Sequence, residues 1–299
     1  MKKTSIGGQA LIEGVMMRGP SKIGIAVRKP NNEIELKIED IKLPSRKYKI
    51  LQVPFIRGMI ALGEAMYIGV SALMFSASFW EEDENGNKIE GSSLTPLQTA
   101  GIIATSLGLT ILLFMLLPNF ITTLFAKYIG SPLVLNLIEG IFRLLFFFIY
   151  IVYVSKLEDV KRVFEYHGAE HKSIHAYENG VELTVENIKK YPIMHKRCGT
   201  SFLFMVMMIS IIVLSFFGWP NMIMRIVTRV IALPIVAGIS YEVNKIMGRL
   251  DNNLCNALAK PGLLIQKYAT VKEPDDSQIE VAIAALKSVL PSQGEDDSW

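Results

Sequence analysis

The chain has 299 residues, of which 51% are hydrophobic and 20% are charged. This hydrophobic fraction is high for a soluble chain of this length and argues against an ordinary water-soluble protein. The formal net charge of +3 says little by itself. The informative features are the positions of the apolar runs, of the basic residues and of the four histidines.

Residues 1–54 are predicted to form a small β-rich segment. Lys22–Val27 and Glu33–Ile38 alternate apolar with polar residues, and the Lys-Pro-Asn-Asn stretch between them indicates a hairpin loop. The glycine-rich stretch ahead of them, GGQALIEGVMMRGP, indicates turns or close backbone approach. Its glycine spacing fits neither the dinucleotide-binding pattern nor the P-loop, so a phosphate-binding loop is not predicted.

Residues 55–80 decide how many helices cross the membrane. The segment is long enough to span a bilayer, but it carries Glu64 near its middle and many small residues. We predict an amphipathic helix that lies in the interface or re-enters the bilayer. A fifth spanning helix is the alternative, because the rule that relates basic residues to orientation is statistical.

Two pairs of apolar segments are predicted to span the membrane. Leu97–Leu117 has no charged residue in 21 positions, and Ser201–Trp219 has none in 19, against the ~20 residues that a spanning helix needs. Each is followed by a short proline-containing connection and a second apolar segment. The fold class is therefore mainly α, a polytopic membrane protein with four transmembrane helices in two hairpins, at 97–154 and 201–247.

One charged pair lies inside the first predicted hairpin. Glu139 and Arg143 are four residues apart and share a helix face, so they can neutralise each other as an ion pair that holds the bundle together. A polar path through the membrane is the alternative, because ionisable residues at membrane depth are frequently functional.

The basic residues indicate how the chain is oriented. Residues 1–57 carry 12 Lys and Arg and residues 155–200 carry eight, whereas the short connections within the hairpins carry few. The positive-inside rule places the 1–54, 155–200 and 248–299 segments, and both termini, in the cytoplasm. In that reducing compartment a disulfide between Cys198 and Cys255 is not expected.

The last segment is predicted to contain one short helix. Ser277–Leu290 has apolar residues at helical spacing, and Asp275 and Asp276 ahead of it suit a helix N-cap. The final GEDDSW is predicted to be a disordered tail.

All four histidines lie between positions 167 and 195, where side chains able to bind a metal accumulate. His167-Gly-Ala-Glu170-His171 falls in a predicted helix, 164–178, so both imidazoles can reach one ion. This is the logic of the inverted zinc-protease motif, in which the glutamate is the general base for metal-bound water. Glu170 is therefore the candidate catalytic residue.

Further ligands must come from outside the motif. His195, Cys198 and Glu242 are the candidates, and zinc is the first choice for a mixed set of nitrogen, oxygen and sulfur donors. His175 is predicted to be a local hydrogen-bonding residue, because three histidines on successive turns rarely share one ion. The alternative to a metal site is a cluster in which the imidazoles simply bond neighbouring carboxylates.

Several motifs together resemble the YqhQ-type family of bacterial multi-pass membrane proteins: GGQALIEGVMMRGP, YHGAEHKSIHAYE, HKRCGTSF, GISYE and PGLLIQ…EPDDSQIEVAIAAL. The resemblance covers nearly the whole chain. It implies a bacterial plasma-membrane protein, described as a predicted metal-dependent enzyme without an established activity. The family's HGAEHK falls on His167–Lys172, its H-x-RCGTSF on His195–Phe202 and its YE on Tyr241 and Glu242. The family pattern usually has proline at the place of Lys196.

Two functions follow from this pattern. The first is a membrane-embedded metal-dependent hydrolase that uses Glu170 as general base, with Arg197 available to stabilise an oxyanion. The second is a non-catalytic assembly or adaptor protein in which a structural metal, or a hydrogen-bonded His/Cys cluster, holds the 155–200 loop against the bundle. Transport is a weaker third, since four crossings are few. The lipid bilayer is the expected partner, a protein partner or oligomer is compatible with the sequence, and no nucleic-acid motif is present.

Overall fold

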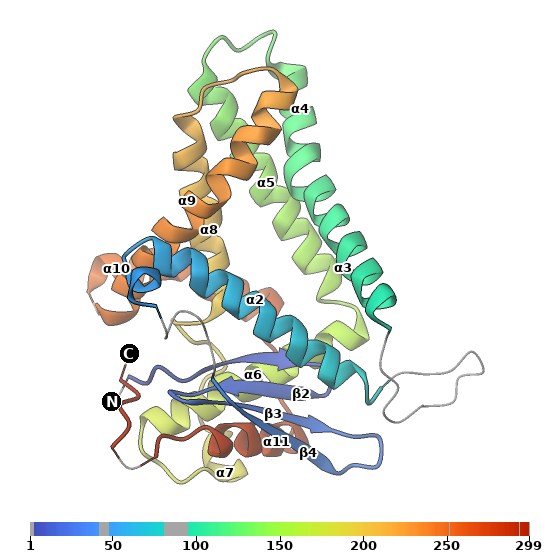
Figure 1. The fold of residues 1–299 in the computed structure, drawn as a ribbon, viewed down its shortest axis with the longest axis vertical. Coiled ribbons are helices and arrows are strands. Elements are labelled where there is room, and N and C mark those ends of the chain that lie inside the picture. The colour runs from blue at the N-terminus through green and yellow to red at the C-terminus, as the bar shows by residue number, and fades with distance from the viewer. Residues whose placement is uncertain (1–2, 42–47, 81–94, 251, 293, 299) are drawn as a thin grey trace, which may run out of the picture.

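The computed structural model describes residues 3–41, 48–80, 95–250, 252–292 and 294–298. Two parts follow one another along the long axis of the molecule (Figure 1). One is a bundle of long helices, and the other, which we call the polar domain, is a small sheet with helices packed on it. Helix α2 (Ile56–Ala77) crosses obliquely between them, packed on α9 of the bundle and β1 of the sheet.

The N-terminal segment forms a four-stranded antiparallel sheet with the strands in chain order. Its strands are β1 (Gly7–Leu11), β2 (Gly14–Arg18), β3 (Lys22–Arg28) and β4 (Ile34–Asp40). The predicted β-rich segment and its hairpin are thus confirmed. The glycine-rich stretch supplies a second hairpin, β1–β2, whose turn holds Glu13 at a φ of 49°.

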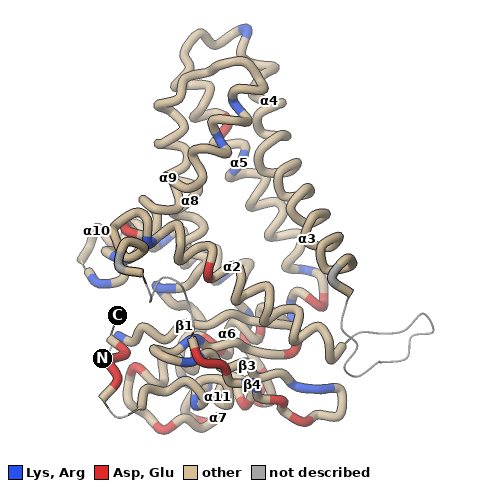
Figure 2. The backbone as a smooth tube through the Cα atoms, viewed as in Figure 1, with Lys and Arg blue, Asp and Glu red and all other residues tan. Residues whose placement is uncertain are grey.

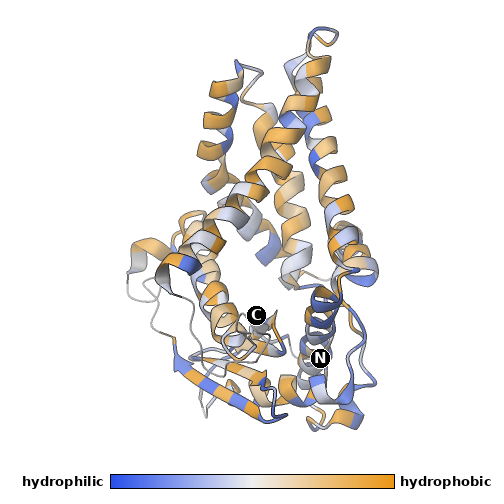
Figure 3. Ribbon diagram, turned by 90° about the vertical axis from the view of Figure 1, so that its right-hand side faces the viewer, coloured by the Kyte–Doolittle hydropathy of each residue, from blue (hydrophilic) through white to orange (hydrophobic). Residues whose placement is uncertain are grey.

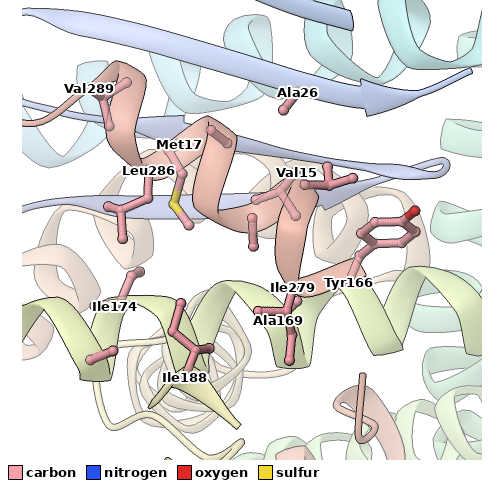
Figure 4. Close-up of a cluster of buried hydrophobic side chains, with 14 of the residues drawn as sticks. Val15, Met17, Ala26, Tyr166, Ala169, Ile174, Ile188, Ile279, Leu286 and Val289 are labelled. Atoms are coloured by element: carbon pink, nitrogen blue, oxygen red, sulfur yellow. The ribbon is translucent and has the colours of Figure 1, made fainter. Parts of the chain in front are cut away.

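Helices from two distant parts of the sequence complete the polar domain. Helix α6 (Glu158–Glu178) and α11 (Asp276–Ser288) pack on the sheet, and the short α7 (Val185–Ile188) packs on both helices. Their apolar faces meet strand β2 in one core, in which Val15, Met17, Tyr166, Ile279 and Leu286 are fully buried (Figure 4). The predicted C-terminal helix is confirmed, and Asp275 caps it through a capping box with Gln278.

The bundle consists of two antiparallel pairs, in which apolar residues predominate (Figure 3). One pair comprises α3 (Pro96–Ile111), the π-helical turn η2 (Leu112–Leu116), α4 (Leu117–Phe125) and α5 (Pro132–Val154). The other comprises α8 (Gly199–Ser215) and α9 (Met222–Arg249). Exposed large apolar side chains cover these helices, which suits contact with lipid.

Within the described residues, four helical segments are long and apolar enough to cross a membrane: 56–77, 97–125, 132–154 and 222–249. Three of them correspond to predicted spans. The fourth is α2, which we predicted to lie in the interface, whereas the predicted span at 201–219 corresponds to α8, a shorter apolar helix of 17 residues. The coarse fold is therefore as predicted. By length and composition, however, the four candidate spanning helices include α2 in place of α8.

Charged residues are concentrated in the polar domain and around the ends of the bundle helices (Figure 2). The predicted Glu139–Arg143 pair is present, at 2.7 Å, and the structure adds Arg229 of α9, which bonds both carboxylate oxygens of Glu139. Glu139 is only 1% exposed. One buried carboxylate thus bonds two arginines and links α5 to α9.

The C-terminal segment contains more structure than predicted. A helix, α10 (Asn253–Ile265), continues into the π-helical turn η3 (Gln266–Thr270). The predicted disorder of the tail is wrong for residues 294–298. Asp297 is 1% exposed and accepts hydrogen bonds from the hydroxyls of Thr4 and Tyr177, the latter at 2.7 Å. These buried bonds attach the C-terminal end of the chain to its N-terminal end, and both ends lie beside the polar domain (Figure 1).

A candidate metal centre on helix α6

Helix α6 presents a row of side chains able to bind a metal. His167, His171 and His175 recur every four residues, and Glu178 follows three residues later, so all four lie along one face of the helix. The segment that leads into α8 lies across this face and contributes His195 and Cys198. Residues predicted from the sequence to act together are therefore adjacent in space.

The first group of ligand-type atoms belongs to His167, His171 and Cys198. One ligand atom from each lies within 4.8 Å of the other two, and the imidazole centroids of the two histidines are 4.4 Å apart. The Nε2 of His167 is 3.2 Å from the Sγ of Cys198. Two donors of one zinc ion lie at most about 4.4 Å apart, since zinc–nitrogen and zinc–sulfur bonds are roughly 2.0–2.3 Å long. Small side-chain shifts would satisfy that geometry, so the three residues fit a divalent metal.

Backbone carbonyls orient both imidazoles of this group. The Nδ1–H of His167 donates to the carbonyl of Thr270 at 2.9 Å, and the Nδ1–H of His171 donates to the carbonyl of Ile193. With the proton on Nδ1, each Nε2 keeps its lone pair. Metal-ligating histidines are generally held by such a bond from the other ring nitrogen.

Glu170 is buried beside this group, with 4% of its surface exposed. Burial raises the pKa of its carboxyl, and the neighbouring His167 and a hydrogen bond from the backbone of Gly8 oppose the effect only in part. Its carboxylate is 3.9 Å from Nε2 of His167. A Cβ at position 8 would lie 2.9 Å from the Cγ of Glu170 and 2.6 Å from the carbonyl of Met16. Gly8 therefore allows strand β1 to cover the glutamate.

A cavity of about 100 Å³ lies against these side chains. Its lining includes His167, Glu170, His171 and Cys198, together with the backbone of β1. This volume accommodates a few water molecules or a small group of a substrate. The candidate metal ligands and the candidate base thus face one common space.

A second group lies one turn further along α6. Ligand atoms of His175, Glu178 and His195 also lie within 4.8 Å of one another. Glu178 accepts hydrogen bonds from the backbone of Thr4, at 2.8 Å, and from Arg197. Burial, with only partial opposition from the hydrogen bond to Glu178, lowers the pKa of His195 to about 4. Arg197 competes with any cation for Glu178, so this group is occupied by its own ion pair.

The structure does not bring Glu242 into either group. Its carboxylate forms an ion pair with Arg57 at the start of α2, with Arg57 Nε 2.7 Å from Oε1. Glu178 was expected from the sequence only as one of the carboxylates that the histidines could bond, and His175 as a local hydrogen-bonding residue. His175 does donate from Nε2 to the carbonyl of Met194 at 2.9 Å. The helical spacing along α6, four residues between the histidines and three from His175 to Glu178, was the signal that placed both on the face of the site.

Close packing explains why the residue at position 168, within the His-Gly-Ala-Glu-His motif, is a glycine. A Cβ there would lie 2.0 Å from the carbonyl of Lys272. The amide of Lys272 in turn donates to the carbonyl of Phe164 at 2.9 Å. Glycine therefore lets the segment after η3 pack against the helix at the level of the site, and this close approach places the Thr270 carbonyl beside His167.

Comparison with known proteins identifies the family. The sequence pattern of a family described as "Protein of unknown function (DUF1385)" matches residues 53–292. The chain belongs to this family. It is also 34% identical over 297 residues to the "Uncharacterized protein YqhQ" of Bacillus subtilis (strain 168), covering 95% of this chain and 92% of that protein. The resemblance inferred from the motifs is thus confirmed, and no solved structure matches.

In this DUF1385 chain the His167–His171–Cys198 group offers two nitrogens and one sulfur to an ion, and Glu170 offers a carboxylate close by. Three protein ligands that leave one position open are typical of catalytic zinc sites, whereas four are typical of structural ones. The arrangement therefore has the donors for a metal and a neighbouring group that can accept a proton.

Proposed function

We propose that this protein is a membrane-bound, metal-dependent hydrolase whose centre is held by His167, His171 and Cys198. One observation carries the proposal: the three ligand-type side chains converge within 4.8 Å beside a cavity that Glu170 also lines. A purely structural cluster has no need of a cavity, or of a buried carboxylate that has no Lys or Arg nitrogen within 4 Å among the described residues. A bound divalent ion would supply Lewis-acid activation of water.

The remaining chemistry is assigned to the chain's own residues. Glu170 accepts the proton that water loses as it attacks the substrate, and it can return that proton to the leaving group. The carbonyls of Thr270 and Ile193 hold the two imidazoles in the required tautomer. Arg197 lines the same cavity, where its charge can stabilise a developing oxyanion. His195 belongs, in this proposal, to the neighbouring hydrogen-bonded group, and Glu242 to the ion pair with Arg57.

Metal analysis and one matched pair of variants test the proposal. Purified full-length protein should contain about one zinc or other divalent ion per chain, and His167→Ala should lose it. Glu170→Gln should keep both metal and fold but behave like a gene deletion in cells. Glu165→Gln, on the same helix, is the control, because glutamine can still accept the bond from Gln278. If wild type holds no stoichiometric metal, or if the Glu170 variant supports cells as wild type does, the hydrolase is excluded.

A non-catalytic role is the second candidate, and the short His167–Cys198 contact favours it. At 3.2 Å these two side chains form a hydrogen bond without any metal. The cluster would then fasten the segment before α8 to α6 in an assembly or adaptor protein. In that case His167→Ala should lower stability, while Glu170→Gln should leave function in cells unchanged.

We further propose that the protein lies in the bacterial plasma membrane with the polar domain and both termini in the cytoplasm. The distribution of basic residues supports this orientation. The oblique course of α2 between bundle and sheet supports an interfacial position for that helix (Figure 1). A cysteine at position 187 should react with a membrane-impermeant maleimide only after cells are opened. Labelling in intact cells would overturn the orientation.

A further inference from the structure

A much larger cavity lies where the polar domain meets the helices. It encloses about 870 Å³ between strands β1 and β2, helix α2, the start of α8 and the end of α9. This volume is within the range of small-molecule binding sites. Neither the candidate metal centre nor the bundle accounts for it.

One wall of this cavity is basic. Lys245 and Arg249 project from the last turns of α9, and Arg18 stands at the end of β2. Lys245 is half-buried, and among the described residues no carboxylate oxygen lies within 4 Å of the side-chain nitrogens of Lys245 or Arg249. The acidic residue of the lining, Asp296, accepts hydrogen bonds from Ser298. This wall is suited to an anion.

The wall formed by α2 is apolar and contains several small residues. Gly58, Ala61, Leu62 and Ala65 line the cavity. The same helix exposes Met66 and Tyr67 to the surroundings, with 61% and 75% of their surfaces accessible. Helix α2 is itself apolar enough to enter a membrane. A molecule in the cavity would therefore contact cations on one side and a membrane-compatible helix on the other.

The two cavities are adjacent. Gly7, Gly8, Arg197, Cys198 and Gly199 line both of them. Two of these glycines leave open space, since a Cβ at position 7 or 199 would meet no atom within 4 Å. A group bound against Lys245 and Arg249 can thus extend past Cys198 toward Glu170.

We propose that the large cavity binds a membrane lipid that carries a phosphate group, with the phosphate on Lys245 and Arg249 and the apolar part along α2. The inference that this lipid is the substrate rests on the proposed hydrolase activity. The proposal that the cavity binds the lipid does not depend on that activity. Phosphate is the anion that a bilayer presents at the depth where its helices leave the hydrocarbon. The basic wall alone would equally accept a soluble phosphate ester, and the α2 wall favours the lipid.

Three probes on delipidated full-length protein in non-ionic detergent separate these sources. Dioctanoyl phosphatidic acid carries both a phosphate group and acyl chains. Glycerol 3-phosphate carries only the phosphate, and dioctanoylglycerol carries only the acyl chains. By titration calorimetry, phosphatidic acid should bind at least tenfold more tightly than either of the others. Equal affinity for glycerol 3-phosphate would assign the cavity to a soluble ester and overturn the proposal, and equal affinity for dioctanoylglycerol would overturn the role of the cations.

Paired variants locate the binding site. Lys245→Ala with Arg249→Ala should weaken phosphatidic acid binding about tenfold or more, because two charge-assisted contacts are lost. Lys260→Ala with Lys267→Ala is the control: it removes the same charge from exposed positions outside the lining and should change nothing. Ala61→Leu, which fills the apolar wall without altering charge, should also weaken binding. Equal binding by the two double variants would overturn the proposal.

Metal content distinguishes this proposal from the hydrolase itself. The Lys245/Arg249 double variant should keep the metal that wild type holds, and His167→Ala should still bind phosphatidic acid. If wild type contains no metal yet shows the predicted lipid binding, the hydrolase fails and the lipid site stands. If metal is bound as expected but phosphatidic acid is not, the lipid site fails and the hydrolase stands.

Discussion

Two buried polar clusters in this molecule use similar residues in opposite ways. In the bundle, Glu139 accepts bonds from Arg143 and Arg229, and Arg143 also bonds the carbonyl of Phe114 and the hydroxyl of Ser210. In the polar domain, Glu170 is buried to a similar degree, but among the described residues no Lys or Arg nitrogen lies within 4 Å of its carboxylate, and it lines a cavity. In the first cluster the arginines bond both oxygens of the carboxylate, whereas the second leaves ligand-type atoms facing a cavity.

The difference shows which buried polar groups point to function. Both oxygens of the Glu139 carboxylate already accept bonds from guanidinium groups, and its contribution is to link helices α5 and α9. In the α6 row, backbone carbonyls hold His167 and His171 through Nδ1, and the Nε2 of His167 contacts only the Sγ of Cys198, a partner that can itself bind a metal. The comparison therefore supports a structural role for Glu139 and a binding role for the α6 row.

Replacing Glu139, the buried carboxylate of the bundle, by an uncharged residue should have the largest effect on stability. Glu139→Gln leaves two buried arginines without their counter-charge, which should lower the free energy of unfolding by about 3–5 kcal/mol. Metal content and lipid binding of the protein that remains folded should not change. Thermal unfolding in detergent measures the effect, with the exposed Glu158→Gln as control. A loss of metal without a loss of stability would reverse the roles that we assign to the two clusters.

Crowding the motif glycine should have an intermediate effect that is centred on the site. Gly168→Ala puts a methyl group against the carbonyl of Lys272, and overpacking of this kind costs about 1–3 kcal/mol. Displacing the segment after η3 also moves the Thr270 carbonyl that orients His167, so metal affinity should fall. Gly101→Ala, at a position where a Cβ meets no atom within 4 Å, is the control. If the Gly168→Ala protein is destabilised but binds metal as tightly as wild type, the Thr270 carbonyl is not needed to orient His167 for the metal.

The smallest effect is expected at Glu242. Its ion pair with Arg57 is partly exposed, so Glu242→Gln should cost at most about 1 kcal/mol. Because the carboxylate is held by Arg57 rather than by the α6 row, metal content should equal that of wild type. Mass-spectrometric metal analysis decides the point. Loss of the ion in this variant would return Glu242 to the ligand set and extend the site into the bundle.

Much of the architecture could be predicted because its signals are local. The alternation in Lys22–Val27 and Glu33–Ile38, the apolar run at Leu97–Leu117 and the capping residues before α11 are each read from a few neighbouring positions. The set of spanning helices was less predictable. Residues 55–80 contain a long apolar helix with one internal glutamate, and the membrane affinity of such a helix depends on what it packs against.

The candidate site shows the same division. The four-residue spacing of His167 and His171 identified the motif and its helix, and the proximity of Cys198 in sequence correctly suggested a further member of the group. Glu242, 71 residues beyond His171, was a candidate from the sequence, but the structure pairs it with Arg57. Gly8 covers Glu170 from a strand more than 150 residues away, and no sequence pattern predicts such a contact.

The sequence by itself determined the elements of this protein: a β-rich start, long apolar helices and a helical row of side chains of the types that can bind a metal. These follow from periodicity, helix-capping residues and the hydrophobic effect, which act between near neighbours or on whole segments. Only the tertiary structure decided that Cys198 meets His167, that Arg57 holds Glu242 and that a basic wall on α9 faces an apolar wall on α2. Those pairings depend on how helices and strands pack across long separations, where shape and charge complementarity select one arrangement among many that the same elements allow.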